Sequence, residues 1–143
     1  MTGTAEAEGA ASDRSASSGE VRVVRRDTGE VLISSARWCE SRLCRLRGFQ
    51  FRRSLRPGEA LILVHRQDSV AMTSIHMLFV FFPIAAVWID SRGLVTSAQL
   101  AKPFRPYYAS PEPARYVLES DPELLERIAI GDEVEFVGAP GAL

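Results

Sequence analysis

The chain has 143 residues, of which 46% are hydrophobic and 24% are charged. These totals fit one domain with a packed core, and they exclude a chain too polar to fold. The formal net charge is −1, but residues 21–56 carry ten arginines and three acids, whereas residues 57–143 carry six cations and eleven acids. We expect the first segment to contact the second within the domain, because clustered arginines alone are a weak signal for nucleic-acid binding.

The first 19 residues are small or polar, and they lack the apolar segment and basic start of a signal peptide. We therefore expect a disordered tail at residues 1–19, a single globular domain at 20–138 and a short flexible tail at 139–143. Without a targeting signal, the expected location is the reducing cytoplasm.

The first expected elements are a β-hairpin and a helix. Two short β-branched runs around an Asp-x-Gly turn predict a hairpin at 21–33. Apolar residues then recur at steps of three and four, which predicts a helix over 36–47. Ser34 or Ser35 is the expected N-cap of this helix, and Gly48 is suited to end it.

Both cysteines fall within this expected helix. Cys39 and Cys44 are five residues apart, and five helical residues turn the chain through roughly 500°. Their side chains would point in different directions, so no disulfide between them is expected. They also lack metal-ligand spacing.

The middle of the chain is strongly apolar. The continuous run Ala60–Val64 predicts a strand that is buried on both faces. Residues 70–89 are rich in β-branched and aromatic side chains, and they predict two or three strands with a break at Pro83. In this interpretation residues 74–82 and 84–89 are antiparallel neighbours in one sheet.

A membrane alternative arises from the same segment. Residues 69–89 carry no charge, and 21 residues are enough for a helix that spans a bilayer. His76, Pro83 and the strand-like composition argue against a spanning helix, and no basic cluster adjoins the segment closely. We expect a soluble protein without a membrane span, and membrane association through 69–89 is the alternative.

The rest of the chain predicts short strands, one long loop and a second helix. These elements are expected at 94–98 (strand), 101–114 (proline-rich loop), 115–119 (strand), 122–129 (helix) and 133–137 (strand). Pro122 fits the first turn of a helix that Ser120 or Asp121 caps. Together the elements predict an α+β, mainly β fold, a compact antiparallel β-barrel-like sheet with two short helices.

Short motifs in a fixed order carry a family resemblance. They are Arg47–Gly48–Phe49, Ser74–Ile75–His76, Phe82–Pro83–Ile84, Val87–Trp88–Ile89–Asp90, Val117–Leu118–Glu119 and Ile130–Gly131–Asp132. Over about residues 36–136 their order resembles the domain of unknown function 192 family, small bacterial and archaeal domains of uncharacterised role. The resemblance implies a compact antiparallel barrel-like sheet with one or two helices, and it implies no known activity.

The chain departs from the family pattern at three positions. Ala85 replaces the aspartate after Phe-Pro-Ile, Met77 replaces a threonine, and Val80 replaces a methionine. These substitutions predict a weaker polar site than in relatives that keep the family residues.

Three side chains are candidates for a ligand site. Arg52 matches a family arginine and can hold a carboxylate or phosphate bidentately, and His76 is a polar group in an apolar run. Tyr107 lies in the proline-rich loop, where aromatic rings line pockets. The alternatives are an ion pair of Arg52 with Glu119 or Asp132, a structural histidine at the edge of the core, and an aromatic anchor for the loop.

The leading functional hypothesis is a small binding or accessory domain for an unidentified small ligand or protein. No Ser–His–Asp order, phosphate-binding glycine loop or pair of catalytic carboxylates occurs, so an enzyme is the weaker alternative. Two histidines and two cysteines without ligand spacing predict no metal site, and no cofactor or nucleic-acid partner is expected.

Overall fold

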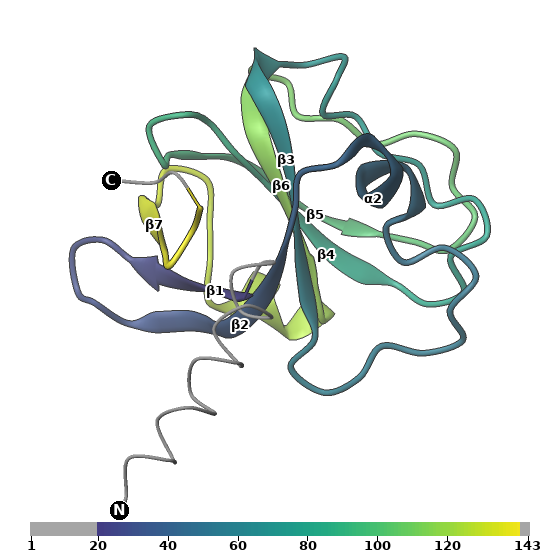
Figure 1. Cartoon of the computed structure of the whole chain (residues 1–143), viewed down its shortest axis with the longest axis horizontal. Helices are drawn as coiled ribbons and strands as arrows, with labels where there is room; N and C mark the ends of the chain where they lie inside the picture. The colour runs from purple at the N-terminus through teal and green to yellow at the C-terminus, as the bar shows by residue number, and fades with distance from the viewer. Residues whose placement is uncertain (1–19, 141–143) are drawn as a thin grey trace, which may run out of the picture.

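A computed structural model describes residues 20–140. Seven strands form one curled, barrel-like sheet, accompanied by a short α-helix and a 3₁₀ turn (Figure 1). The elements are β1 (Glu20–Arg25), β2 (Val31–Cys39), α2 (Arg42–Arg47), β3 (Ala60–Ser69), β4 (Ile84–Ile89), β5 (Val95–Ala101), β6 (Ala114–Ser120), η1 (Pro122–Glu126) and β7 (Val134–Val137). The mainly β prediction is confirmed. The two predicted helices are one short α-helix and one 3₁₀ turn, and the predicted tail at 1–19 lies outside the described residues.

The strand order is β5-β4-β6-β3-β2-β1-β7. The late strand β6 lies between β3 and β4 and pairs antiparallel with both of them. β2 and β3 are parallel, because α2 and the following loop return the chain to the end of the sheet at which β2 begins. The other pairs are antiparallel, so the predicted antiparallel sheet contains one parallel exception.

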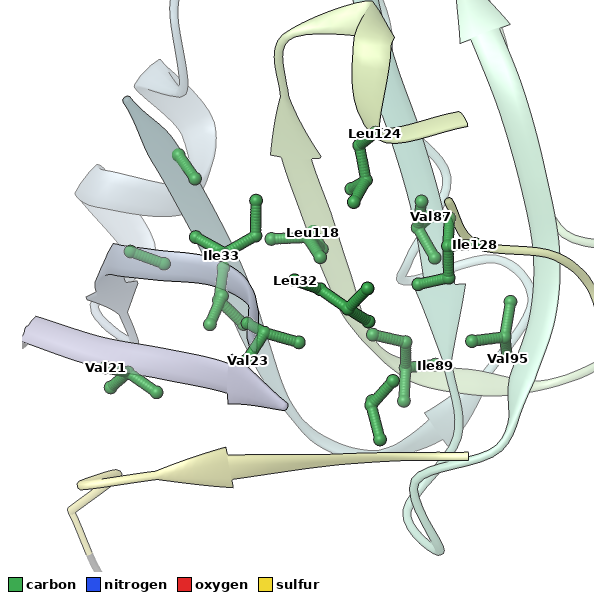
Figure 2. Close-up of a cluster of buried hydrophobic side chains, with 14 of the residues drawn as sticks. Val21, Val23, Leu32, Ile33, Val87, Ile89, Val95, Leu118, Leu124 and Ile128 are labelled. Carbon is green, nitrogen blue, oxygen red and sulfur yellow. The ribbon is translucent and has the colours of Figure 1, made fainter. Parts of the chain in front are cut away.

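The main core fills the inside of the curled sheet. Figure 2 shows side chains from β1, β2, β4, β6 and the η1 region that meet there, among them Val23, Leu32, Val87, Leu118 and Leu124. A second apolar cluster covers the opposite face of the central strands. β4 is therefore buried along its whole length, and the predicted burial of 60–64 on both faces is confirmed.

The predicted hairpin is confirmed. β1 and β2 pair antiparallel, and Gly29 N–H donates to the Arg25 carbonyl at 2.9 Å in the connecting turn. Gly29 has φ +77°, a left-handed backbone that glycine adopts at little cost.

The predicted helix at 36–47 is wrong over its first half. β2 continues to Cys39, because Arg37 pairs with β1 and residues 37–39 pair with β3. The helix begins after Ser41, whose Oγ accepts from Cys44 N–H at 3.1 Å, and it ends at Gly48 as predicted. Pairing with two neighbouring strands outweighed the local helical pattern, because tertiary contacts routinely override helix propensity.

The two cysteines form a disulfide, which corrects the sequence prediction. The error lay in placing both on one helix. Cys39 ends β2 and Cys44 lies in α2, and the turn between them brings their Cα atoms to 5.6 Å. This separation is usual for a disulfide. Because such bonds persist in oxidising compartments, the cytoplasmic location remains a prediction only.

Residues 74–82 are not the strand that was predicted. They form turns and a loop, and β4 pairs instead with β5 and β6. An isolated bridge between Ile75 and Tyr108 joins this loop to the proline-rich loop. The Trp88 indole N–H donates to the Thr73 carbonyl at 2.8 Å and holds the loop over β4.

The second predicted helix is a 3₁₀ turn that ends at Glu126 rather than near Ala129. Asp121 is the cap, and its Oδ1 accepts from Glu123 N–H at 2.8 Å. The Asp132 carboxylate accepts a hydrogen bond from Ala129 N–H at 2.9 Å, and the chain turns there towards β7 instead of continuing the helix.

Replacing Cys44 with serine should lower the free energy of unfolding by about 2 kcal/mol, because the bond closes a short loop of the unfolded chain. Urea unfolding in non-reducing buffer measures this loss. Reductant should destabilise the wild type to the level of the variant and leave the variant unchanged. Equal stability of the two proteins in non-reducing buffer would contradict the structural role of the bond.

Candidate functional site

A cavity of about 220 Å³ lies on the outer face of the central strands. Its floor comes from three adjacent strands, with Leu63 on β3, Glu119 on β6 and Ile84 on β4. Its walls are α2, residues 48–50 and the loop over 72–80. Figure 1 shows α2 and these loops gathered on one side of the sheet.

Glu119 is the one acidic side chain that lines this cavity. The period of two along β6 places it on the same face as Val117, in the second apolar cluster. Its cross-strand neighbours are Leu61 on β3 and Ala86 on β4, and neither can form a hydrogen bond through its side chain. The residue is 5% exposed, and no other residue within 20–140 hydrogen-bonds to its carboxylate.

Burial raises the pKa of Glu119 to about 7. The cause is desolvation, because removal from water disfavours the charged form of a carboxyl group and no cation compensates. A Cβ atom at Gly48 would lie 3.7 Å from Oε1, so the end of α2 approaches the carboxylate closely. A carboxyl group that titrates near neutral pH and faces a cavity is a hallmark of functional sites.

His65 lies on β3 beside this floor and lines the same cavity. Its Nδ1 is 3.3 Å from the Arg115 carbonyl oxygen. A hydrogen bond between these two atoms requires a proton on Nδ1, because the carbonyl can only accept. Burial lowers the pKa of His65, which favours the neutral ring at pH 7.

His76 lies at the mouth of the cavity and is exposed. Its Nδ1 accepts from Leu78 N–H at 3.3 Å, and its Nε2 is 3.2 Å from the Gln50 side-chain amide. These contacts fix the ring, and the side chain of Gln50 joins the wall behind α2 to the 72–80 loop.

Three arginines of α2 form the basic wall of the cavity. Arg45 is anchored, because its guanidinium donates to the carbonyls of Glu40 and Val64. Arg42 and Arg47 are exposed, and neither forms an ion pair with another of the residues that the structure describes. The disulfide at Cys44 fixes the same short helix to the end of β2.

The structure does not bring the three predicted site residues together. His76 lines the cavity, whereas Arg52 and Tyr107 are not among its lining residues, and Tyr107 is 61% exposed. Arg52 donates to both carboxylate oxygens of Glu59, each at 2.7 Å. This hydrogen-bonded pair lowers the pKa of Glu59 below its usual value.

The predicted alternatives for Arg52 need correction. An ion pair exists, but its acid is Glu59, and neither Glu119 nor Asp132 takes part. Asp132 pairs with Arg25 at 2.8 Å.

The three departures from the family pattern fall in different places. Met77 and Val80 line the cavity, so apolar atoms occupy positions that are a threonine and a methionine in the family pattern. Ala85 is fully buried in the main core, on the opposite face of β4 from Ile84 and the cavity.

Glu119 was not predicted as a site residue. One signal was available, because an acid that follows Val117 by two positions shares its apolar face if the strand is central. The position of β6 in the middle of the sheet is a long-range fact that the pattern did not show.

Comparison with known families places the chain. The DUF192 model, described as an uncharacterised ACR, matches residues 23–136. The chain belongs to the DUF192 family. It is 26% identical over 110 residues to a UPF0127 protein of Pyrococcus furiosus, which covers 76% of this chain and 91% of that protein. It is 30% identical over 92 residues to a UPF0127 protein of Pyrococcus abyssi, which covers 63% and 75%.

Two solved structures share the DUF192 chain's fold. A protein of Sinorhizobium meliloti, described as a candidate transcription regulator, superimposes with a TM-score of 0.71 at 22% identity and covers 83% of this chain and 93% of that one. A protein of unknown function from Novosphingobium aromaticivorans gives 0.68 at 21% identity, with 81% and 83% covered. At these identities the likeness concerns the fold alone, and the family description assigns no activity.

The described part of the chain also bears on the membrane alternative. Between residues 20 and 140, no helix has the length and apolar character needed to cross a bilayer. Residues 69–89 contain the end of β3, a loop and β4.

Replacing Glu119 with glutamine should change how the free energy of unfolding depends on pH. The folded state binds more protons than the unfolded state between pH 4.5 and about 7, so the wild type loses stability as the pH rises through this window. The shift of 7 − 4.5 = 2.5 corresponds to on the order of 3 kcal/mol. Relative to the wild type, the variant should therefore gain stability between about pH 5 and about pH 8.

Urea unfolding at both pH values measures this difference. Glu112→Gln is the matched control, because Glu112 is exposed and its replacement should leave the pH dependence unchanged. Parallel pH profiles for the wild type and Glu119→Gln would contradict the raised pKa.

Proposed function

We propose that this domain binds a small molecule in the cavity above Glu119, and that the ligand offers an ammonium or another N–H donor to the carboxylate. The observation that carries the proposal is a nearly buried carboxylate without a partner among residues 20–140. The Glu119 oxygens are not among the enclosed, unpartnered polar atoms of residues 20–140, so they open onto the cavity, where water or an N–H group of a ligand can reach them. A cavity of about 220 Å³ leaves room for such a ligand.

The wall of the cavity suggests the other end of the ligand. Arg42 and Arg47 are exposed on α2, and a guanidinium binds carboxylate or phosphate groups through two parallel hydrogen bonds. A small zwitterion, with its amine at Glu119 and its anionic group at the arginines, satisfies both ends. Met77 and Val80 also line the cavity with apolar atoms, which favours an aliphatic linker between the two charged ends.

The proposal has a definite pH dependence. An ammonium binds the ionised carboxylate and lowers its pKa, so binding releases a proton wherever Glu119 is still protonated in the free protein. Affinity should rise as the pH increases through about 7, until the amine itself loses its proton.

An enzyme is the second candidate, and the pKa of Glu119 favours it. A carboxyl group that titrates near neutral pH can take up and return a proton. A nucleophile is harder to find, because Ser74 carries the one hydroxyl among the lining residues and donates to the Ala71 carbonyl at 2.8 Å. Binding alone explains the described groups with fewer assumptions.

A thermal-shift comparison tests the proposed binding. The probes are γ-aminobutyrate and phosphoethanolamine, and the matched compounds without an amine are butyrate and glycerol phosphate. At about a hundredfold excess over Kd, a ligand stabilises the folded state by about 2.7 kcal/mol, which is a shift of several degrees. The amines should raise the Tm of the wild type, and they should do so more strongly at about pH 8 than at about pH 6.

Three variants separate binding in the cavity from unspecific effects. Glu119→Gln should lose the shift relative to its own ligand-free melt, and Glu112→Gln should keep it. Arg47→Gln should weaken the response to both amine probes, because each carries an anionic group. The proposal would be refuted if neither amine raised the Tm of the wild type, or if Glu119→Gln showed the same Tm shift as the wild type.

A further inference from the structure

Four phenylalanines form an aromatic patch on the surface: Phe51, Phe79, Phe81 and Phe104. Each is between 48% and 63% exposed. Phe51 and Phe79 stack with their ring centroids 5.2 Å apart, and Phe81 and Phe104 meet edge to face at 5.3 Å. Because Phe79 and Phe81 are two residues apart on one loop, the two pairs lie close together. Leu78, in the same loop, adds a further exposed apolar side chain.

The backbone under this patch is unusual. Phe51, Phe79 and Phe104 have φ angles of +66°, +63° and +65°, and they are the non-glycine residues with positive φ among those described. A left-handed backbone is a clear outlier for a bulky side chain, and such outliers persist only where the surroundings hold them. Phe51 N–H donates to the Phe79 carbonyl, and Phe104 N–H donates to the Met77 carbonyl, both at 2.8 Å. Three separate loops are therefore joined at the patch.

The segments that form the patch are positively charged. The three segments that form it are 49–58, 76–83 and 100–108. They carry three arginines plus Lys102 and Arg105, five cations in all, and no acid; Glu59, which follows the first segment, pairs with Arg52. Arg53, Lys102 and Arg105 are exposed, and none of them belongs to an ion pair within residues 20–140. The patch is therefore a surface of phenyl rings bordered by exposed cations.

We propose that this patch docks the protein onto the surface of an anionic lipid bilayer. Exposed phenyl rings enter the boundary between headgroups and acyl chains, and neighbouring cations bind the negative surface of the leaflet. A second copy of the chain is a poor occupant, because Arg53, Lys102 and Arg105 of the two copies would face one another.

Co-sedimentation of the full chain with vesicles tests the proposal. One set of vesicles contains phosphatidylcholine alone, and the other contains phosphatidylcholine mixed with phosphatidylglycerol. The protein should pellet with the mixed vesicles at low salt and remain in the supernatant with phosphatidylcholine alone. Raising the salt concentration should release much of the bound protein, because exposed charges are screened.

The decisive variant is Phe79→Asn with Phe104→Asn. Asparagine adopts the left-handed backbone more readily than phenylalanine, so the two loops keep their conformation while the aromatic area is lost. Binding to the mixed vesicles should fall at least tenfold. The matched control is Ile130→Asn, because Ile130 is 67% exposed and lies outside the three segments. It should bind like the wild type.

A charge variant, Arg53→Glu with Arg105→Glu, should also abolish binding while circular dichroism and the thermal melt remain those of the wild type. The proposal is overturned if no binding to the mixed vesicles occurs, if both vesicle types bind equally, or if the asparagine variant binds normally. Self-association that sedimentation velocity detects, and that the asparagine variant loses, would assign the patch to a second copy if vesicles do not bind.

Discussion

The pairing of β6 between β3 and β4 determines the character of this molecule. It satisfies the backbone of β6 on both edges, and it places Glu119 between Leu61 and Ala86 on an apolar face. Hydrocarbon packed directly on an unpaired carboxylate would leave it without water or a partner, which costs several kcal/mol or more. The covering loops therefore pack tightly around Met77 and Val80 and leave a cavity over the acid. The carboxyl group thus faces an open space rather than packed hydrocarbon.

The elements that cover this face have few local means of stability. α2 has six residues and buries none of them, so its own helical bonds cannot fix its position. Three ties hold it: the Ser41 cap, the disulfide to the end of β2, and Arg45, which reaches the Val64 carbonyl of β3. The 72–80 loop is held in the same way, by Trp88 from below and by backbone bonds to the proline-rich loop. The loops that wall the cavity thus also carry the aromatic patch, although a ligand in one and a lipid surface on the other engage different atoms.

Local chemistry explains which parts of the fold the sequence predicted. The hairpin, the buried run at 60–64 and the cap at Asp121 depend on residues close together in the chain. Asp121, for example, accepts from Glu123 N–H at 2.8 Å, as expected for an acid that caps the first turn. The length of β2 and the loop at 74–82 depend on partners far away. The apolar pattern of the sequence does not show that β3 pairs with the end of β2. Nor does it show that β6, rather than residues 74–82, pairs with β4.

The same distinction explains the candidate site. His76 and Arg52 drew attention because each stands out from its immediate neighbours in the sequence, and Arg52 then found its partner Glu59 within the same loop. Glu119 is notable for the opposite reason, because its carboxyl group has no partner in three dimensions among residues 20–140. A sequence shows which groups are present, but the lack of a partner can be seen only when all neighbours of a side chain are known. The structure supplies what the sequence lacks, the surroundings of each polar group, and at Glu119 these surroundings are apolar strands below and a cavity above.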